Sequence, residues 1–310
     1  MARLRTWGPD MVSAPIDIVY TWVDGERADY RALVARHAST HAHINPERTR
    51  DDLELLRFSL RSVWQFVPWI NRVHVVAQRP QVPSWLDTER VTMVHHDEIF
   101  EDPANLPTFN CNAIESHLHR VRTSSDWFLY CNDDFLFGAP TPRDTFVTDD
   151  GRIRVAGTLF GRSHRRVHDR CYVPSLGFIE HGPLLIYRPW FEEMIAVHRA
   201  EVEATRARRF RGPRDVRMDG LYRHHLLTHH APDVVPEPFW RYVRYARFHK
   251  ITRQAARQRR ALAALRANPP RFYCLNDDQR DTPNPAVQHE VRRFLEASYP
   301  TPSPYERTTS

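Results

Sequence analysis

The sequence has no apolar run long enough to cross a membrane. Its longest apolar stretches, such as residues 16–20 and 72–77, have the length of strands, whereas a membrane-spanning helix needs about 20 residues. The first ten residues carry positive charge but no following apolar segment, so they do not resemble a secretory signal. We therefore predict a cytoplasmic protein that is not integral to the membrane.

Cysteine is scarce and lysine almost absent. The four cysteines, Cys111, Cys131, Cys171 and Cys274, form no C-x-x-C pair, which excludes a zinc ribbon and a small disulfide scaffold. We expect reduced, mostly buried thiols. Of 44 basic residues only Lys250 is a lysine, so the net charge of +6 reflects a bias towards arginine that is typical of genome composition. The arginine-rich stretches 206–217 and 241–260 fit an anionic membrane surface, a nucleic acid or a phosphorylated substrate, or simply solvated helix faces.

Hydrophobic periodicity predicts an α/β fold. Residues 16–20 form a β-branched run that ends at the turn signal Asp24-Gly25, and apolar residues recur at helical spacing between Asp51 and Phe66. Strand patterns follow at 72–77, 91–94 and 127–131, and Asn110 is placed to cap a helix that reaches Val121. Strand, helix and strand in succession indicate a mostly parallel, Rossmann-like sheet flanked by helices.

The second half of the sequence is predicted to add helices. We expect a strand at 153–159 and helices at 189–199, 216–228, 253–267 and 285–298. No internal repeat divides the chain, so we predict an extension at 1–15, one α/β domain at 16–298 and a C-terminal tail at 299–310. The tail holds three prolines without periodicity, and we expect it to be frayed.

The sharpest local signal is Asn132-Asp133-Asp134, directly after the apolar strand 127–131. Two adjacent carboxylates repel each other unless a cation or proton lies beside them, and Mg²⁺ or Mn²⁺ is a natural partner that also binds phosphate. A simple turn or helix cap is the alternative. Thr21 and Trp22, in the loop that ends at Gly25, suit a base or ribose, or a Trp packed at a sheet edge.

Three further residues are candidates for chemistry. Glu115 lies one helical turn before His119, where a solvated ion pair is the alternative. His181 precedes Gly-Pro in a loop, which can present an imidazole to a cleft. Arg211 could hold phosphate oxygens with two hydrogen bonds. The histidine pairs at 95–96, 224–225 and 229–230 lack the H-E-x-x-H spacing of zinc enzymes, and their side chains should diverge.

Several segments together resemble the Stealth family of sugar-1-phosphate transferases. Residues 16–25 are similar to the first signature block of that family. The second block is matched in order by 50–53, 59–62, 83–86, 106–110, 113–117 and 130–138, and the fourth by 271–277. The third block is represented by His181 with Pro183 and by Arg211 with Asp215. The resemblance covers about residues 16 to 300.

The resemblance implies a glycosyltransferase-A type core that binds a nucleotide sugar, with a donor half at 16–138 and an acceptor half at 139–298. It implies transfer of a sugar 1-phosphate from a nucleotide diphosphate sugar, a UDP-sugar by preference, to a hydroxyl of an acceptor glycan in capsule or cell-wall synthesis. The implied catalytic residues are Glu115, Asp133, Asp134, His181 and Arg211. His181 is our first choice of general base, with Glu115 or Asp133 as alternatives.

Binding residues follow from the loop and from the resemblance. The donor is expected to contact Thr21, Trp22, Asp24, Gly25, Arg61 and Asn276, and the metal to be held by Asp133, Asp134 and Asp277. We expect no nucleic-acid partner, and peripheral association with the inner membrane leaflet remains open. A metal-dependent glycosyltransferase that releases nucleoside diphosphate, and a non-enzymatic binding module, are the alternative functions.

Overall fold

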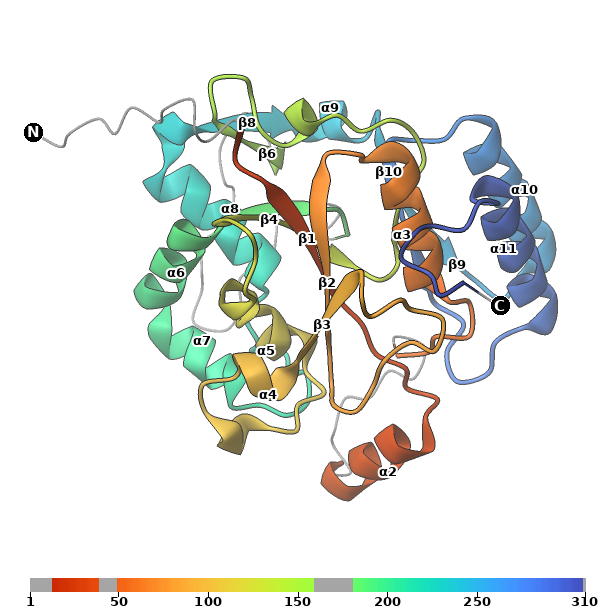
Figure 1. Ribbon diagram of the computed structural model, residues 1–310, viewed down its shortest axis with the longest axis horizontal. Coiled ribbons are helices and arrows are strands. Elements are labelled where there is room, and N and C mark those ends of the chain that lie inside the picture. Colours follow the sequence, from red (N-terminus) through yellow and green to blue (C-terminus); the bar gives the residue numbers. More distant parts are fainter. Residues whose placement is uncertain (1–12, 39–48, 159–180, 309–310) are drawn as a thin grey trace, which may run out of the picture.

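The computed structural model describes residues 13–38, 49–158 and 181–308. A sheet with the strand order β3-β2-β1-β4-β7 forms the centre of the molecule (Figure 1). Its strands are β1 (Ile16–Thr21), β2 (Ile70–Ala77), β3 (Val91–His95), β4 (Trp127–Asn132) and β7 (Leu184–Tyr187). All neighbours pair in parallel except β4 and β7, which are antiparallel. The predicted mostly parallel α/β sheet is therefore confirmed.

A second sheet lies beside the first and carries the C-terminal part of the chain. Its order is β5-β10-β9, with β5 (Phe135–Phe137), β10 (Phe272–Asp277) and β9 (Ala246–Ile251). Helix α3 (Leu55–Phe66) lies between the two sheets, because Leu56, Leu60 and Val63 belong to the core of the central sheet while Phe58 belongs to the core under β10. Helices α10 (Ala255–Ala267) and α11 (Pro285–Ser298) cover the outer side of this second sheet (Figure 1).

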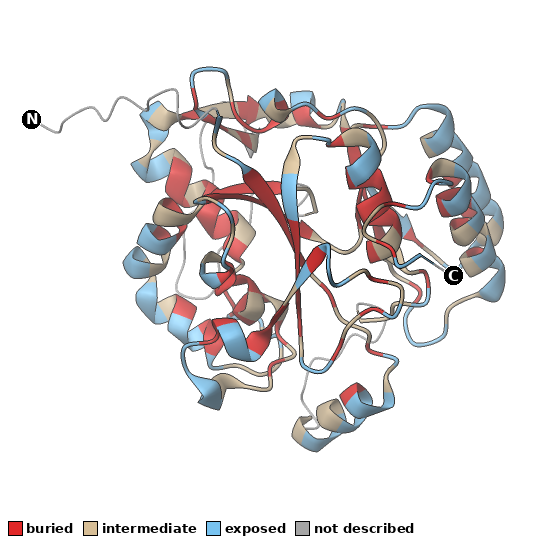
Figure 2. Cartoon of the chain, in the orientation of Figure 1, coloured by how far each residue is buried: buried red, intermediate tan, exposed pale blue. Residues whose placement is uncertain are grey.

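The remaining elements surround the central sheet. They are α2 (Ala28–His37), α4 (His96–Ile99), α5 (Cys111–Glu115), α6 (Arg188–Val197), α7 (Arg199–Arg206), α8 (Met218–His229), α9 (Phe239–Tyr242) and the parallel pair β6 (Ile153–Thr158) and β8 (Val234–Pro238). Short 3₁₀ turns lie at Pro103–Asn105, Leu118–Arg120, Arg143–Thr145 and Ala231–Asp233. Figure 2 shows that the buried residues concentrate in the central strands and on the inner faces of the helices. Among the described residues, no helix combines the length and the apolar character that a membrane span requires.

The predicted frayed tail is wrong for residues 299–308, which pack onto the protein. Tyr299 is 2% exposed, and its hydroxyl donates to the carbonyl of Phe137 at 2.9 Å. Glu306 is buried and accepts hydrogen bonds from Arg61 and Arg57. Prolines and missing periodicity excluded a helix here, but they did not exclude a segment anchored by a buried ion pair.

Two helix boundaries also differ from the prediction. The helix expected to reach Val121 is regular only to Glu115, because the side chains of Ser116 and His117 bond back to the carbonyl of Ala113 and compete with the helical pattern. The Asn110 cap is confirmed, since its side chain accepts from the backbone of Asn112. The helix expected between Asp51 and Phe66 is α3, and it begins only at Leu55, after Glu54 in the left-handed conformation.

Candidate active site

A cavity of about 440 Å³ opens where the carboxyl ends of β1 and β4 meet. Thr21 and Asn132 are paired across these two strands, so the residues that follow each strand reach the same edge of the sheet. Open α/β sheets bind their ligands at this edge. The cavity is lined by most of the predicted site residues, namely Thr21, Trp22, Glu115, Asp133, Asp134, His181, Arg211, Asn276 and Asp277. Its volume is that of a site for a small organic ligand.

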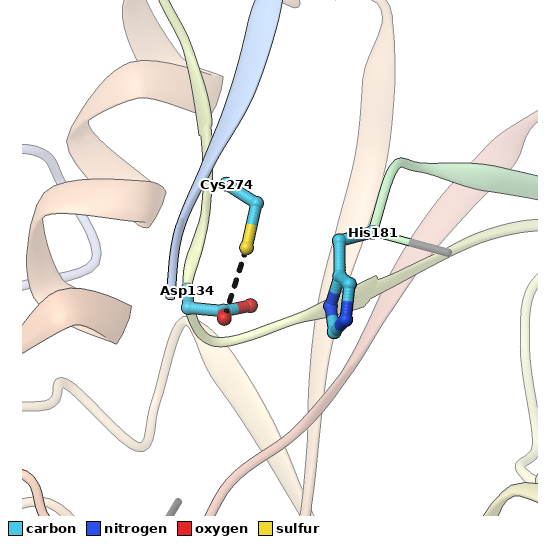
Figure 3. Close-up of side chains that lie close together, drawn as sticks. All are labelled: Asp134, His181 and Cys274. Carbon is cyan, nitrogen blue, oxygen red and sulfur yellow. Dashed lines mark hydrogen bonds between the residues drawn. The ribbon is translucent and has the colours of Figure 1, made fainter. Parts of the chain in front are cut away.

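Asp134 lies where the two sheets touch. The thiol of Cys274 on β10 donates to Oδ2 of Asp134 at 3.0 Å (Figure 3). Nδ2 of Asn276 lies 3.4 Å from the same oxygen. The other carboxylate oxygen of Asp134 and the side-chain oxygen of Asn276 are buried without a hydrogen-bond partner among the described residues. Buried oxygens of this kind normally have a partner, so both are available to a ligand in the cavity.

A hard divalent cation fits these oxygens. Burial, followed by the negative charges of Asp134 and Asp51, raises the pKa of Asp133 well above its ordinary value. Mg²⁺ and Mn²⁺ prefer carboxylate and amide oxygens and relieve such repulsion. Asp133, Asp134 and Asn276 would hold the ion, and Asp277 follows at the end of the same strand.

Glu115 is buried rather than solvated, so the surface ion pair with His119 is excluded. Its carboxylate lies 3.1 Å from the hydroxyl of Tyr130, which in turn is 2.5 Å from Oδ1 of Asn132 and 3.1 Å from the hydroxyl of Thr21. Burial, followed by the charge of Asp219, raises the pKa of Glu115 to about 7. A carboxyl with this pKa can exchange a proton near neutral pH.

Arg50 and Asp51 line the cavity but are not among the predicted site residues. Nη1 of Arg50 donates to Oδ2 of Asp277 at 2.6 Å, and this buried ion pair fixes the end of β10. Burial raises the pKa of Asp51 to about 7, with the Trp22 side chain acting in the opposite direction. Both residues lie in a segment that matches the second Stealth block, which was the signal that could have identified them.

Two arginines, Arg211 and Arg217, line the cavity and act on the charge of Glu115. Arg211 is exposed and belongs to the segment between α7 and α8. Asp215 holds this segment by accepting from the backbone of Gly212, from Arg208 and from Asn110. Arg217 also lines the cavity and pairs with Asp219 at 3.2 Å, a further pair that sequence reasoning missed.

His181 enters the cavity from the loop before β7. A ring nitrogen of His181, an oxygen of Asp134 and the sulfur of Cys274 lie within 4.8 Å of one another, and the imidazole faces the carboxylate (Figure 3). The ring stacks on Phe248 at a centroid distance of 4.9 Å. The structure therefore places His181 beside Asp134.

Three predicted binding residues do not line the cavity. Asp24 shapes the loop, because its carboxylate accepts from the backbone of Glu26. Gly25 donates to the carbonyl of Thr49, and a Cβ at this position would come within 2.3 Å of the Thr49 hydroxyl. The prediction that Arg61 contacts the donor is wrong, because its guanidinium donates hydrogen bonds to Glu306 and to the carbonyl of Tyr299.

Comparison with known families gives three matches along the chain. They are described as Stealth protein CR2, conserved region 2, at residues 48–155; Stealth protein CR3, conserved region 3, at 180–228; and Stealth protein CR4, conserved region 4, at 263–310. The chain belongs to the Stealth family. These Stealth regions contain the acidic pair, His181 with Arg211, and Asn276 with Asp277, respectively, so each contributes residues to the cavity.

Curated Stealth relatives carry the name exopolysaccharide phosphotransferase. The chain is 35% identical to one protein of Streptomyces coelicolor over 96% of its own length and 53% of the relative, and 31% identical to one of Nocardia farcinica over 100% and 64%. The chain thus spans little more than half to about two thirds of these relatives. Among solved structures, a galactosyltransferase LgtC in complex with donor and acceptor sugar analogs matches with a TM-score of 0.47 and 15% identity, covering 93% of this chain and 98% of that one.

Proposed function

We propose that this chain transfers a sugar 1-phosphate from a nucleotide diphosphate sugar to a hydroxyl of an acceptor glycan, with release of nucleoside monophosphate. The supporting observation is a cavity at the carboxyl end of the sheet. Its lining combines buried carboxylate and amide oxygens that have no hydrogen-bond partner among the described residues with the arginines Arg211 and Arg217. The relatives named exopolysaccharide phosphotransferase support the reaction class and a role in polysaccharide synthesis.

The acidic end of the cavity is proposed to hold Mg²⁺ or Mn²⁺ through Asp133, Asp134 and Asn276, with Asp277 beside them. When bound, such an ion neutralises charge on the diphosphate oxygens. The carboxylates would hold the ion at a fixed position beside β4 and β10, because the sheets fix the backbone of these residues. Asp277 is further positioned by its ion pair with Arg50.

His181 is proposed to accept the proton of the acceptor hydroxyl. Its imidazole faces Asp134 from a separate loop, so it would lie beside an acceptor hydroxyl bound next to the metal site. Arg211 and Arg217 supply positive charge for the phosphate oxygens. Glu115, with a pKa of about 7, is the alternative base.

We extend the proposal to the setting of the reaction. Thr21 and Trp22 lie at the donor side of the cavity and suit the nucleoside of a UDP-sugar, so residues 16–138 would bind the donor and 139–298 the acceptor. Helix α10 carries the exposed arginines Arg257, Arg260 and Arg266, which support peripheral contact with the cytoplasmic face of a membrane.

The nucleotide product tests the proposal. The protein would be incubated with individual UDP-sugars, Mn²⁺ and a panel of methyl glycosides, and the nucleotides separated by chromatography. Attack at phosphorus yields UMP in proportion to acceptor, and a phosphodiester signal in the phosphorus NMR spectrum of the glycan. Acceptor-dependent UDP as the sole nucleotide product would contradict the proposal and indicate a glycosyltransferase, because attack at the anomeric carbon leaves both phosphates on the nucleotide.

A further inference from the structure

A second group of metal-ligating side chains lies outside the cavity, where α6 packs against α8. Glu193 comes from α6 and His225 from α8, and His230 is the residue directly after α8. One ligand atom of each lies within 4.8 Å of the others. None of the three lines the cavity of the active site.

The distances between these atoms fit a shared metal. Nε2 of His230 lies 3.0 Å from one carboxylate oxygen of Glu193, and Nε2 of His225 lies 3.7 Å from the other. Metal to ligand bonds of about 2.0–2.1 Å place tetrahedral ligand atoms about 3.3–3.4 Å apart. The separation of 3.7 Å at His225 is close to this value, whereas 3.0 Å at His230 is also the length of the hydrogen bond that its Nε2 forms with Glu193. The longer one exceeds hydrogen-bond distance, so a hydrogen bond to Glu193 does not account for the position of His225.

His225 carries the strongest indication of a missing ligand. Its side chain is 0% exposed, and neither ring nitrogen has a hydrogen-bond partner among the described residues. A buried imidazole without partners costs free energy, because it gave up its bonds to water on folding. A metal bound to Nε2 would satisfy one of these nitrogens.

We propose that Glu193, His225 and His230 form a binding site for a divalent transition metal of the Zn²⁺ type that joins α6 to α8. Two imidazoles and one carboxylate suit Zn²⁺, whereas Mg²⁺ and Ca²⁺ prefer ligand sets made only of oxygen. Glu193 is 45% exposed, so the site opens to solvent on one side and water completes the shell. The proposal does not depend on the proposed transferase activity.

The surroundings support a preformed site. The ring of Trp190 stacks on His230 at a centroid distance of 4.2 Å and fixes its orientation. His229 lies next to His225 with a centroid distance of 4.7 Å, which adds a further imidazole at the exposed rim. His225 and His230, one member each of the pairs 224–225 and 229–230, both lie beside Glu193. Strand β7 follows His181 in the sequence, and α6 directly follows β7. A metal that joins α6 to α8 would therefore stabilise the helices next to this strand.

The test is a zinc titration of the 310-residue chain after treatment with a chelator. Calorimetry is expected to detect a site that excess Mg²⁺ does not occupy, and saturating Zn²⁺ is expected to raise the melting temperature by several degrees. Glu193→Gln and His230→Ala should each weaken Zn²⁺ binding at least about 100-fold, since even residues that only support a ligand cost 10–100-fold. Both side chains are partly exposed, so these variants should fold.

Controls separate this site from the other candidate group and from surface binding. His289→Ala removes an exposed histidine on α11 and should leave Zn²⁺ affinity unchanged. Co²⁺ at the proposed site should give a tetrahedral visible spectrum without a thiolate charge-transfer band, whereas Co²⁺ beside Cys274 would show that band. Unchanged Zn²⁺ affinity in Glu193→Gln and His230→Ala, or loss of binding in Cys274→Ser, would overturn the proposal.

Discussion

The thiol of Cys274 donates to the carboxylate of Asp134 at 3.0 Å across the boundary between two sheets. The backbone adds to this link, because the amide of Leu275 donates to the carbonyl of Asp134 at 2.9 Å. The acidic pair is therefore held by two segments that lie about 140 residues apart in sequence. This contact brings Asn276 and Asp277 to the cavity.

Asp134→Asn is expected to lower kcat/KM at least about 10²–10³-fold and to weaken Mn²⁺ binding, because one charge leaves the proposed metal site. The melting temperature of the metal-free protein should not fall, since the change relieves repulsion with Asp133. Calorimetry with Mn²⁺ and a turnover assay measure the two effects. Asp150→Asn removes an exposed carboxylate and should change neither. Wild-type turnover with an unchanged metal requirement would show that the metal binds at another site.

His181→Ala is expected to lower kcat by about 10²–10⁴-fold with donor affinity nearly unchanged. The imidazole faces Asp134, so its loss removes the proposed base without removing a phosphate ligand. The variant should also lose the acidic limb of the pH profile of kcat. A variant that mainly loses donor binding would instead identify His181 as a phosphate ligand and leave Glu115 as the base.

Glu115→Gln is expected to stabilise the metal-free protein at pH 8. Burial raises the pKa of Glu115 from 4.5 to about 7. A raised carboxyl pKa means that the folded state prefers the protonated form, so this contribution to stability is complete below the ordinary pKa and is lost as the pH rises through about 7. Thermal melts of wild type and variant at pH 5 and pH 8 measure the difference. An equal difference in melting temperature at both pH values would contradict the assigned pKa.

Glu306→Gln is expected to lower the free energy of unfolding by about 3–5 kcal/mol, because Arg61 loses the carboxylate that balances its buried charge. Replacing both Arg61 and Glu306 by leucine should cost less than this single change. Glu296→Gln, at an exposed position of α11, is the control. Donor KM should stay unchanged in Glu306→Gln, since the pair does not line the cavity; a large rise in KM would restore a donor role for Arg61.

The ion pair between Arg61 and Glu306 predicts that the folded state loses stability in acid. Although burial opposes ionisation of Glu306, Arg61 and Arg57 lower its pKa from 4.5 to about 2. A lowered carboxyl pKa stabilises the folded state above the ordinary pKa, and this stabilisation is lost as the pH falls from about 4.5 towards 2. Urea unfolding of wild type should show this decline, and Glu306→Gln should show a smaller one. Parallel curves for the two proteins would contradict it.

The sequence by itself determined the strands that carry the site. Apolar runs such as 16–20 and 127–131 are buried on both faces of a parallel sheet, so each strand can be recognised from its own continuous apolar sequence. The residues directly after such strands lie at the carboxyl edge of the sheet. Thr21, Asp133 and Asp134 were therefore predictable, and Asn110 was predictable as a cap because capping depends on the next two residues.

Only the tertiary structure decided which distant residues meet. Glu115 has a surface-like spacing in sequence, but the helix ends at this residue and its carboxylate turns onto Tyr130. Arg61 has the charge of a phosphate ligand, yet a glutamate 245 residues later occupies it, and the same contact orders a tail without any local pattern. His225, His230 and Glu193 converge through the packing of α6 on α8. Ion pairs and ligand clusters of this kind depend on distances in space, which periodicity along the chain does not encode.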